Sequence, residues 1–126
     1  MGLDMYLHVG EMGMKNSEDF EMIGIWRKAN QIRAFFASYV PEKEGENIDN
    51  LVLNLDMLNE LESIIKDVLS DKSLAPDMLP TQSGFFFGSL EYDEGYFNDL
   101  TITLSFIDEA KVHLKAGKLV AYSEWW

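Results

Sequence analysis

Both ends of the chain have the pattern of a β-strand, and this constrains the fold more than any other feature. Residues 3–9 alternate, with Leu3, Met5 and Leu7 on one face. Residues 119–125 follow Gly117 and fit a closing strand. We expect the first and last strands to pair, which would tie both ends of the chain into one sheet.

Three helices are expected between these strands. Residues 25–40 carry apolar side chains at three- and four-residue spacing, and Pro41 ends this pattern. Residues 56–70 have the same periodicity, with Asp56 as the expected N-cap. The last and longest helix is expected over residues 93–114.

The remaining segments complete an α+β domain. A short strand is expected at 51–53 and a loop at 72–84, whereas residues 20–25 fit either a second strand or the start of the first helix. Because 126 residues suffice for one hydrophobic core and no linker interrupts the chain, we expect a single domain over 1–126. Its fold class is α+β, a small and mainly antiparallel sheet of three or four short strands packed with three helices.

The charge of the chain excludes several classes of partner. The formal net charge is −12, which disfavours a nucleic-acid polymer or a membrane surface, since both require many Lys and Arg residues. No Lys or Arg occurs from Ser73 to Ala110, whereas Arg27, Lys28 and Arg33 lie close together. A local site for a small anion is therefore compatible with the sequence. No apolar run is long enough to span a bilayer and no signal peptide is evident, so a cytoplasmic protein is expected.

A phenylalanine run from Pro80 to Ser89 is the first candidate for a shaped site. Phe85, Phe86 and Phe87 lie between two glycines, and residues 85–97 hold six of the sixteen aromatic side chains. This composition fits one wall of a ligand pocket, a core strand between turns, or a protein-binding patch. If the run is a strand, alternation makes Phe85 and Phe87 core residues and leaves Phe86 facing a ligand or partner.

The basic helix expected over 25–40 is the second candidate. There, Trp26, Asn30 and Arg33 would share one face. Arg27, Lys28 and Arg33 would supply charge, Trp26, Phe86 and Tyr92 stacking, and Asn30, Gln82 and Ser83 orientation. The alternative is that Trp26 lies in the core and the basic side chains pair with the acidic stretch around Glu91, Asp93 and Asp99. The predicted ligand-binding residues are Trp26, Arg27, Lys28, Asn30, Arg33, Gln82, Ser83, Phe86 and Tyr92.

Catalysis has little support in the sequence. The chain has no cysteine and only two histidines, His8 and His113, and it lacks nucleotide-binding fingerprints. Ser83 has no nucleophile-elbow context. We therefore predict no catalytic residue, no metal site and no cofactor.

Three blocks of sequence together resemble a known family. They are Met1 to Leu7, Trp26 to Ile32, and Leu79 to Ser89 together with the four residues Glu91 to Glu94 and the pair Tyr96–Phe97. The set resembles a family of small uncharacterised proteins carried by phages and by bacterial genomes with phage-derived regions. The resemblance implies a phage accessory protein, which would act in the cytoplasm of the host cell.

This chain departs from the family at two positions. The family usually has His where this chain has Arg33 and a bulky aromatic residue where it has Gly95. A general-base role at position 33 is disfavoured, because arginine stays protonated.

These observations predict a non-enzymatic, phage-type accessory protein. It would bind a small anionic or nucleotide-like ligand where the Trp26–Arg33 helix meets the Gln82–Gly88 segment. The alternative is a protein-interaction module that binds a host protein through an acidic, aromatic surface. A small hydrolase or transferase is the third reading.

Overall fold

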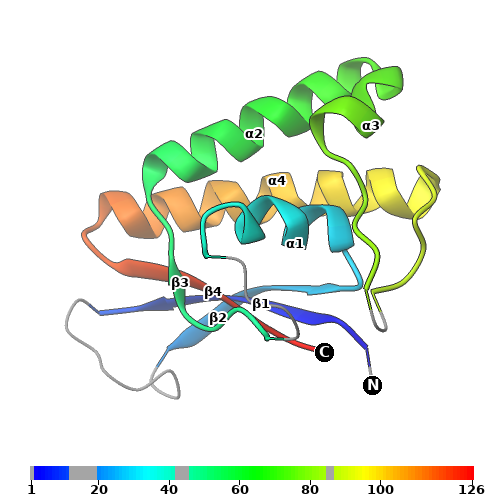
Figure 1. The fold of residues 1–126 in the computed structure, drawn as a ribbon. Helices are drawn as coiled ribbons and strands as arrows, with labels where there is room; N and C mark the ends of the chain where they lie inside the picture. The colour runs from blue at the N-terminus through cyan, green and yellow to red at the C-terminus, as the bar shows by residue number, and fades with distance from the viewer. Residues whose placement is uncertain (1, 12–19, 42–45, 85–86) are drawn as a thin grey trace.

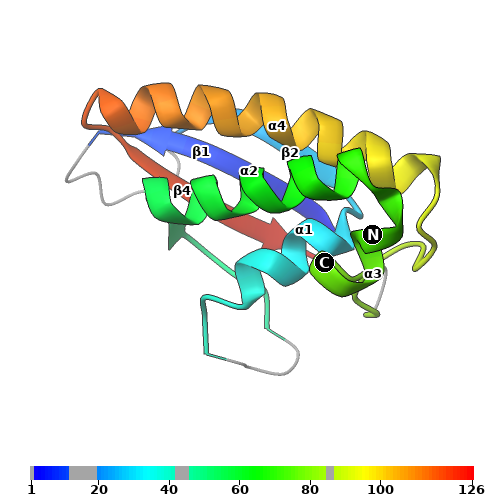
Figure 2. The same ribbon diagram turned by 90° about the horizontal axis from the view of Figure 1, so that it is seen from above.

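The fold is an α+β arrangement of one antiparallel sheet with helices on one of its faces (Figures 1 and 2). This computed structural model describes residues 2–11, 20–41, 46–84 and 87–126. The elements in chain order are β1 (Asp4–Gly10), β2 (Glu21–Arg27), α1 (Asn30–Ala37), β3 (Leu51–Val52), α2 (Leu55–Ser70), the 3-10 turn η2 (Lys72–Leu74), α3 (Ala75–Met78), α4 (Glu94–Lys115) and β4 (Leu119–Trp125). The predicted fold class is confirmed, with the short helix α3 in addition to the three expected helices.

The expected pairing of the first and last strands is confirmed. The sheet has the order β2-β1-β4-β3, so β1 lies at its centre with β4 antiparallel beside it. Residues Leu3, Met5 and Leu7 are almost completely buried against the helices, as their alternation predicted. On the β4 side of this buried face Tyr122 pairs with Leu7, and its ring stacks on Phe36 of α1 at a centroid distance of 4.3 Å.

The first helix is shorter than predicted, because its first five residues belong elsewhere. Residues 25–27 belong to β2, and α1 begins only at Asn30. The strand pairs with β1 over residues 21–27, and Lys28 then turns the chain with a left-handed φ of 58°. The spacing of Ile25, Ala29 and Ile32 is therefore not one helical stripe; Ile25 is exposed on the sheet and the other two are buried.

The later helices end close to their predicted limits. The cap of α2 is Asn54, whose Oδ1 accepts from Met57 N at 2.9 Å, so the prediction of Asp56 as N-cap is wrong. Asp93 caps α4 in the same way, and Gly117 lies just beyond its end with a φ of 84°. The predicted loop at 72–84 contains η2 and α3 before it becomes extended.

The segment from Pro80 to the start of α4 passes the N-terminal end of α1 (Figure 1). No strand forms in the described residues of the phenylalanine run, so the strand alternative fails there. Phe87 is buried, as predicted, whereas Phe85 and Phe86 lie outside the described residues. This passage brings residues 81–99 to the corner between β2 and α1.

Candidate functional site

A cavity of about 290 Å³ lies at the corner where β2 leads into α1. Three parts of the chain form its walls: this corner, the extended segment before α4, and the first turns of α4. The lining residues are Arg27, Lys28, Gln31, Thr81, Gly88, Ser89, Glu91, Asp93, Gly95, Tyr96 and Asp99. Its volume lies just below the range of about 300–1,000 Å³ that is usual for small-molecule sites.

Lys28 is held in a conformation that a residue with a side chain seldom adopts. Its φ of 58° lies in the left-handed region, which costs a residue with a Cβ about 1–2 kcal/mol. The Lys28 N–H donates to Leu3 O at 2.7 Å and so fixes this turn against the start of the sheet. A Cβ placed on Gly88 would lie 2.9 Å from Lys28 Cβ, so glycine at 88 leaves the space that the lysine side chain occupies.

The charged ends of Arg27 and Lys28 converge beside Gly2. A Cβ built on Gly2 would lie 3.8 Å from Arg27 Nη2 and 3.9 Å from Lys28 Nζ. Neither cation forms an ion pair within the part of the chain that the structure describes, although both line a cavity with three carboxylates. The alternative in which these two basic side chains pair with the acidic stretch is therefore not what the geometry shows.

The carboxylates belong to the opposite wall and have different environments. Asp93 caps α4, because its Oδ1 accepts from Tyr96 N at 3.1 Å, while Glu91 is exposed. Asp99, six residues further along the helix, is half-buried. Burial raises the pKa of Asp99 to about 6, the nearby Asp93 adds to the shift, and a hydrogen bond from Gln31 opposes it.

Trp26 is a core residue and does not line the cavity. It is 4% exposed, and its ring packs edge-on against Phe106 at 5.0 Å. Its Nε1 donates to Thr103 Oγ1 at 2.8 Å, so its polar atom is also satisfied. The indole is buried because the residue belongs to the inner face of β2 rather than to a helix.

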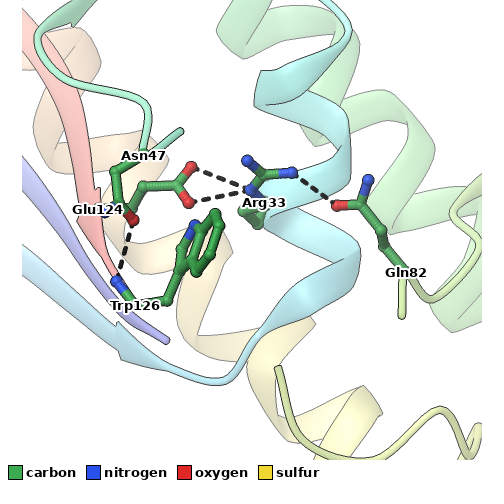
Figure 3. Close-up of polar contacts among 5 residues, drawn as sticks. All are labelled: Arg33, Asn47, Gln82, Glu124 and Trp126. Carbon is green, nitrogen blue, oxygen red and sulfur yellow. Dashed lines mark hydrogen bonds and ion pairs between the residues drawn. The ribbon is translucent and has the colours of Figure 1, made fainter. Parts of the chain in front are cut away.

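Arg33 is the predicted cation that the fold uses internally. Figure 3 shows its guanidinium between Glu124 on β4 and Gln82 on the extended segment. Arg33 Nε lies 3.0 and 2.9 Å from the two Glu124 oxygens, and Nη1 donates to Gln82 Oε1 at 3.0 Å. The Glu124 side chain is completely buried; burial raises the pKa of its carboxyl, and Arg33 opposes that shift. This pair is a structural connection between α1, β4 and the segment before α4.

Aromatic rings and the last residues of the chain enclose the same pair. Arg33 Cζ lies 5.2 Å from the Phe87 ring centroid, and Trp126 packs edge-on against that ring at 5.6 Å. Trp126 N donates to Asn47 Oδ1 at 2.9 Å, as Figure 3 also shows.

Asn30 and Gln82 join the two predicted regions through their own hydrogen bonds. Asn30 Nδ2 donates to Phe87 O at 3.0 Å and to Ser89 O at 2.9 Å, and Asn30 Oδ1 accepts from Gln82 N at 3.0 Å. The start of α1 therefore does pack against the 82–89 segment, as the site prediction requires. However, these bonds are made within the protein, so Asn30 organises the loop that borders the cavity.

The other predicted residues do not line this cavity. Tyr92 is half-buried, and its hydroxyl accepts from Thr81 N at 3.2 Å. Ser83 is exposed, and Phe86 lies outside the described residues. Of the nine predicted residues, Arg27 and Lys28 line the cavity, and Arg33 is not among its lining residues.

Sequence reasoning missed Gln31, Gly95 and Asp99 as lining residues. Asp99 was considered as an ion-pair partner, and the signal for it was the absence of Lys and Arg between 73 and 110. Gly95 gave a further signal, because a glycine in the first turn of a helix weakens that helix without an evident reason. The positions of Gln31 and Asp99 on facing walls depend on tertiary packing.

The described residues show no arrangement for metal chemistry. No group of three or more His, Asp or Glu side chains among them is placed to hold a metal ion. His8 lies on the sheet face away from the helices, where its Nδ1 is buried and has no hydrogen-bond partner among the described residues. Burial lowers the pKa of His8, and Asp49 opposes that shift.

Comparison of the chain with protein-family models, with curated proteins and with solved structures finds no match. The resemblance to phage-carried proteins therefore stays a prediction. Within the described ranges, no helix has both the length and the apolar character that crossing a bilayer requires.

Proposed function

We propose that this protein is a non-enzymatic binding protein for a small anionic ligand, which Arg27 and Lys28 hold in the cavity at the β2–α1 corner. The observation that carries the proposal is that the charged ends of Arg27 and Lys28 lie close together and form no ion pair with a carboxylate of the described residues. Two like charges side by side repel each other, and an anion between them would remove that repulsion. An arginine fork and a lysine ammonium also supply the donors that phosphate and carboxylate groups accept.

The backbone at Lys28 supports this proposal independently. Glycine or asparagine adopts the left-handed region at lower free-energy cost than lysine does. Lysine occupies this position despite that cost, and Gly88 leaves space for its side chain, which supports a role for the ammonium group.

The surroundings of the two cations favour a small ligand over a polymer. Glu91, Asp93 and Asp99 line the same cavity, and the chain has a net charge of −12. A long polyanion would therefore meet repulsion on both sides of the site. A site of this kind would be compatible with a phage accessory protein, which is what the family resemblance implies.

Isothermal titration with inorganic phosphate tests the proposal. Arg27→Gln and Lys28→Gln should each weaken binding about tenfold or more, because each removes a charge-assisted hydrogen bond of roughly 1.5–3 kcal/mol. Lys66→Gln is the matched control: Lys66 is exposed on α2, and its loss changes the net charge equally. Absence of phosphate binding, or equal weakening by all three variants, would refute the proposal.

A second candidate function is protein binding through the sheet face away from the helices. The strand register places Met22, Ile25, Val52 and Trp125 on this face, and their exposed fractions are 51%, 56%, 53% and 68%. An apolar surface of this kind is typical of interaction sites.

The two candidates predict different effects for one variant. Ile25→Arg should abolish capture of a specific partner and leave phosphate binding unchanged if the sheet face is the functional surface. Retention of the captured partner by Ile25→Arg would exclude this face.

A further inference from the structure

We infer that the ligand is dipolar, with an acidic group bound by Arg27 and Lys28 and a protonated amine bound by Asp99. This inference rests on the proposed function and adds the chemical class of the ligand. A small amino acid or an amine that carries a phosphate or carboxylate group has this chemistry.

Opposite charges line one cavity without pairing to each other. Arg27 and Lys28 are on the β2–α1 wall and Asp99 is on the α4 wall, and no ion pair connects them. Elsewhere in the chain, facing side chains of opposite charge do form ion pairs, as Lys111 of α4 and Glu62 of α2 do at 2.9 Å. Cations and carboxylates that face each other across a space are complementary to a molecule with charges at both ends.

Asp99 is the carboxylate best suited to hold the amine. The Asp93 side chain already caps α4, and Glu91 is exposed to solvent. Asp99 is partly removed from water and has no cation partner among the described residues, so burial raises its pKa to about 6. An ammonium group beside it would favour the ionised form and offset the lost hydration. Gln31, whose Nε2 donates to Tyr96 O at 3.3 Å, lies beside this carboxyl and opposes the rise of its pKa.

Gly95 keeps space open on the same wall. A Cβ at this position would meet only Asp93 Oδ1, at 3.4 Å, so the backbone would accept a larger residue. Glycine in a helix costs up to about 1 kcal/mol relative to alanine. The absence of a side chain here leaves room beside the carboxylates for the amine end of a ligand.

A matched pair of probes tests the inference. O-phosphoethanolamine and ethyl phosphate share a phosphate and a two-carbon chain, and only the first carries an amine. Isothermal titration of the whole protein at neutral pH should give a dissociation constant about tenfold lower for O-phosphoethanolamine. Asp99→Asn should abolish this preference and leave ethyl phosphate binding intact. Asp67→Asn, which removes an exposed carboxylate on α2, should retain the preference.

The outcomes separate this inference from the proposed function. If neither probe binds at about 10 mM, the anion site itself is refuted, and the dipolar class with it. If both bind equally, or if ethyl phosphate binds more tightly, the anion site stands and the dipolar class is overturned. If Asp99→Asn keeps the preference, Asp99 is not the amine anchor.

Discussion

The conformation of Lys28 gives the sharpest prediction about the candidate site. The left-handed φ of 58° strains the backbone of this lysine, and glycine at the same position should relieve the strain. We therefore compare Lys28→Gly with Lys28→Ala. Both variants remove the ammonium group, but only alanine keeps a Cβ in the left-handed region, at the φ of 58° that the turn requires.

The magnitude follows from two opposing terms. The left-handed conformation costs a residue with a Cβ about 1–2 kcal/mol, while glycine loses roughly 0.5–1 kcal/mol more conformational entropy on folding than alanine does. The packing of the lysine stem against Gly88 is lost in both variants and cancels in the comparison. Lys28→Gly should thus be more stable than Lys28→Ala by about 0.5–1 kcal/mol.

Urea denaturation followed by circular dichroism measures this difference, and thermal unfolding should show a midpoint higher by about 2–4 °C. Phosphate titration of the same samples should show equal loss of affinity in the two variants, because each lacks the ammonium. If Lys28→Gly is no more stable than Lys28→Ala, the backbone is unstrained and the argument from strain to function is refuted.

Three further variants test the core and the carboxylates. Tyr122→Phe should raise the unfolding free energy by about 1 kcal/mol, because the buried hydroxyl has no hydrogen-bond partner among the described residues and the ring keeps its stacking on Phe36. A less stable protein in urea would contradict this. Glu124→Gln should lower the free energy of unfolding by about 3 kcal/mol, because Arg33 is left without its carboxylate. If the effects of Glu124→Gln and Arg33→Met add in a double-mutant cycle, the two side chains are not energetically coupled and the prediction is refuted. The raised pKa of Asp99 makes its contribution to stability fall as pH rises from about 4 through 6. The free energy of unfolding of Asp99→Asn should therefore be about 1 kcal/mol higher than that of the unsubstituted protein at pH 8, after discounting for solvent screening. If the two proteins show the same dependence of urea stability on pH, this prediction is contradicted.

The strands at the two ends and the two later helices were predictable because each has a local signal. Alternation over 3–9 and helical spacing over 56–70 and 93–114 agree with the burial that the structure shows. The N-cap of the second helix was misplaced by two residues, since Asn54 and Asp56 are both capping residues. Only the backbone geometry distinguishes them.

The boundary between β2 and α1 was wrong for a physical reason. Residues 20–25 fit either a strand or the start of a helix, and Ile25, Ala29 and Ile32 have helical spacing, so the local pattern extended the helix back to Ile25. Pairing with β1 decides in favour of the strand up to Arg27, and such pairing is a long-range interaction that a local pattern does not contain. The left-handed turn at Lys28 carries no glycine or asparagine that would have marked it.

The same limit applied to the site. The sequence placed Arg27, Lys28 and Arg33 in one basic group, and the structure assigns them different environments. Glu124, the partner of Arg33, lies 91 residues away in the chain, so local reasoning had no access to the ion pair. The meeting of α1 with the 82–89 segment was predictable in outline, whereas the polar atoms of Asn30 turned out to bond within the protein.

Three locally destabilising features lie at the cavity, and their occurrence together supports the proposal that the cavity binds a ligand. Lys28 has a left-handed backbone, and Gly95 weakens the first turn of α4. Asp99 is partly desolvated and forms no ion pair among the described residues. Each is unfavourable for folding alone and each faces the same space, whereas the helix caps at Asn54 and Asp93 follow the usual preferences. Other unfavourable features of the described residues lie away from the cavity: Tyr122 Oη, His8 Nδ1 and Trp126 Nε1 are buried without a hydrogen-bond partner among those residues, and Asn50 has a left-handed φ of 54°. If ligand binding is the reason for the three features at the cavity, then Lys28→Gly and Asp99→Asn should each weaken ligand binding and raise the free energy of unfolding. Substitution of a purely structural residue does not have this pair of effects.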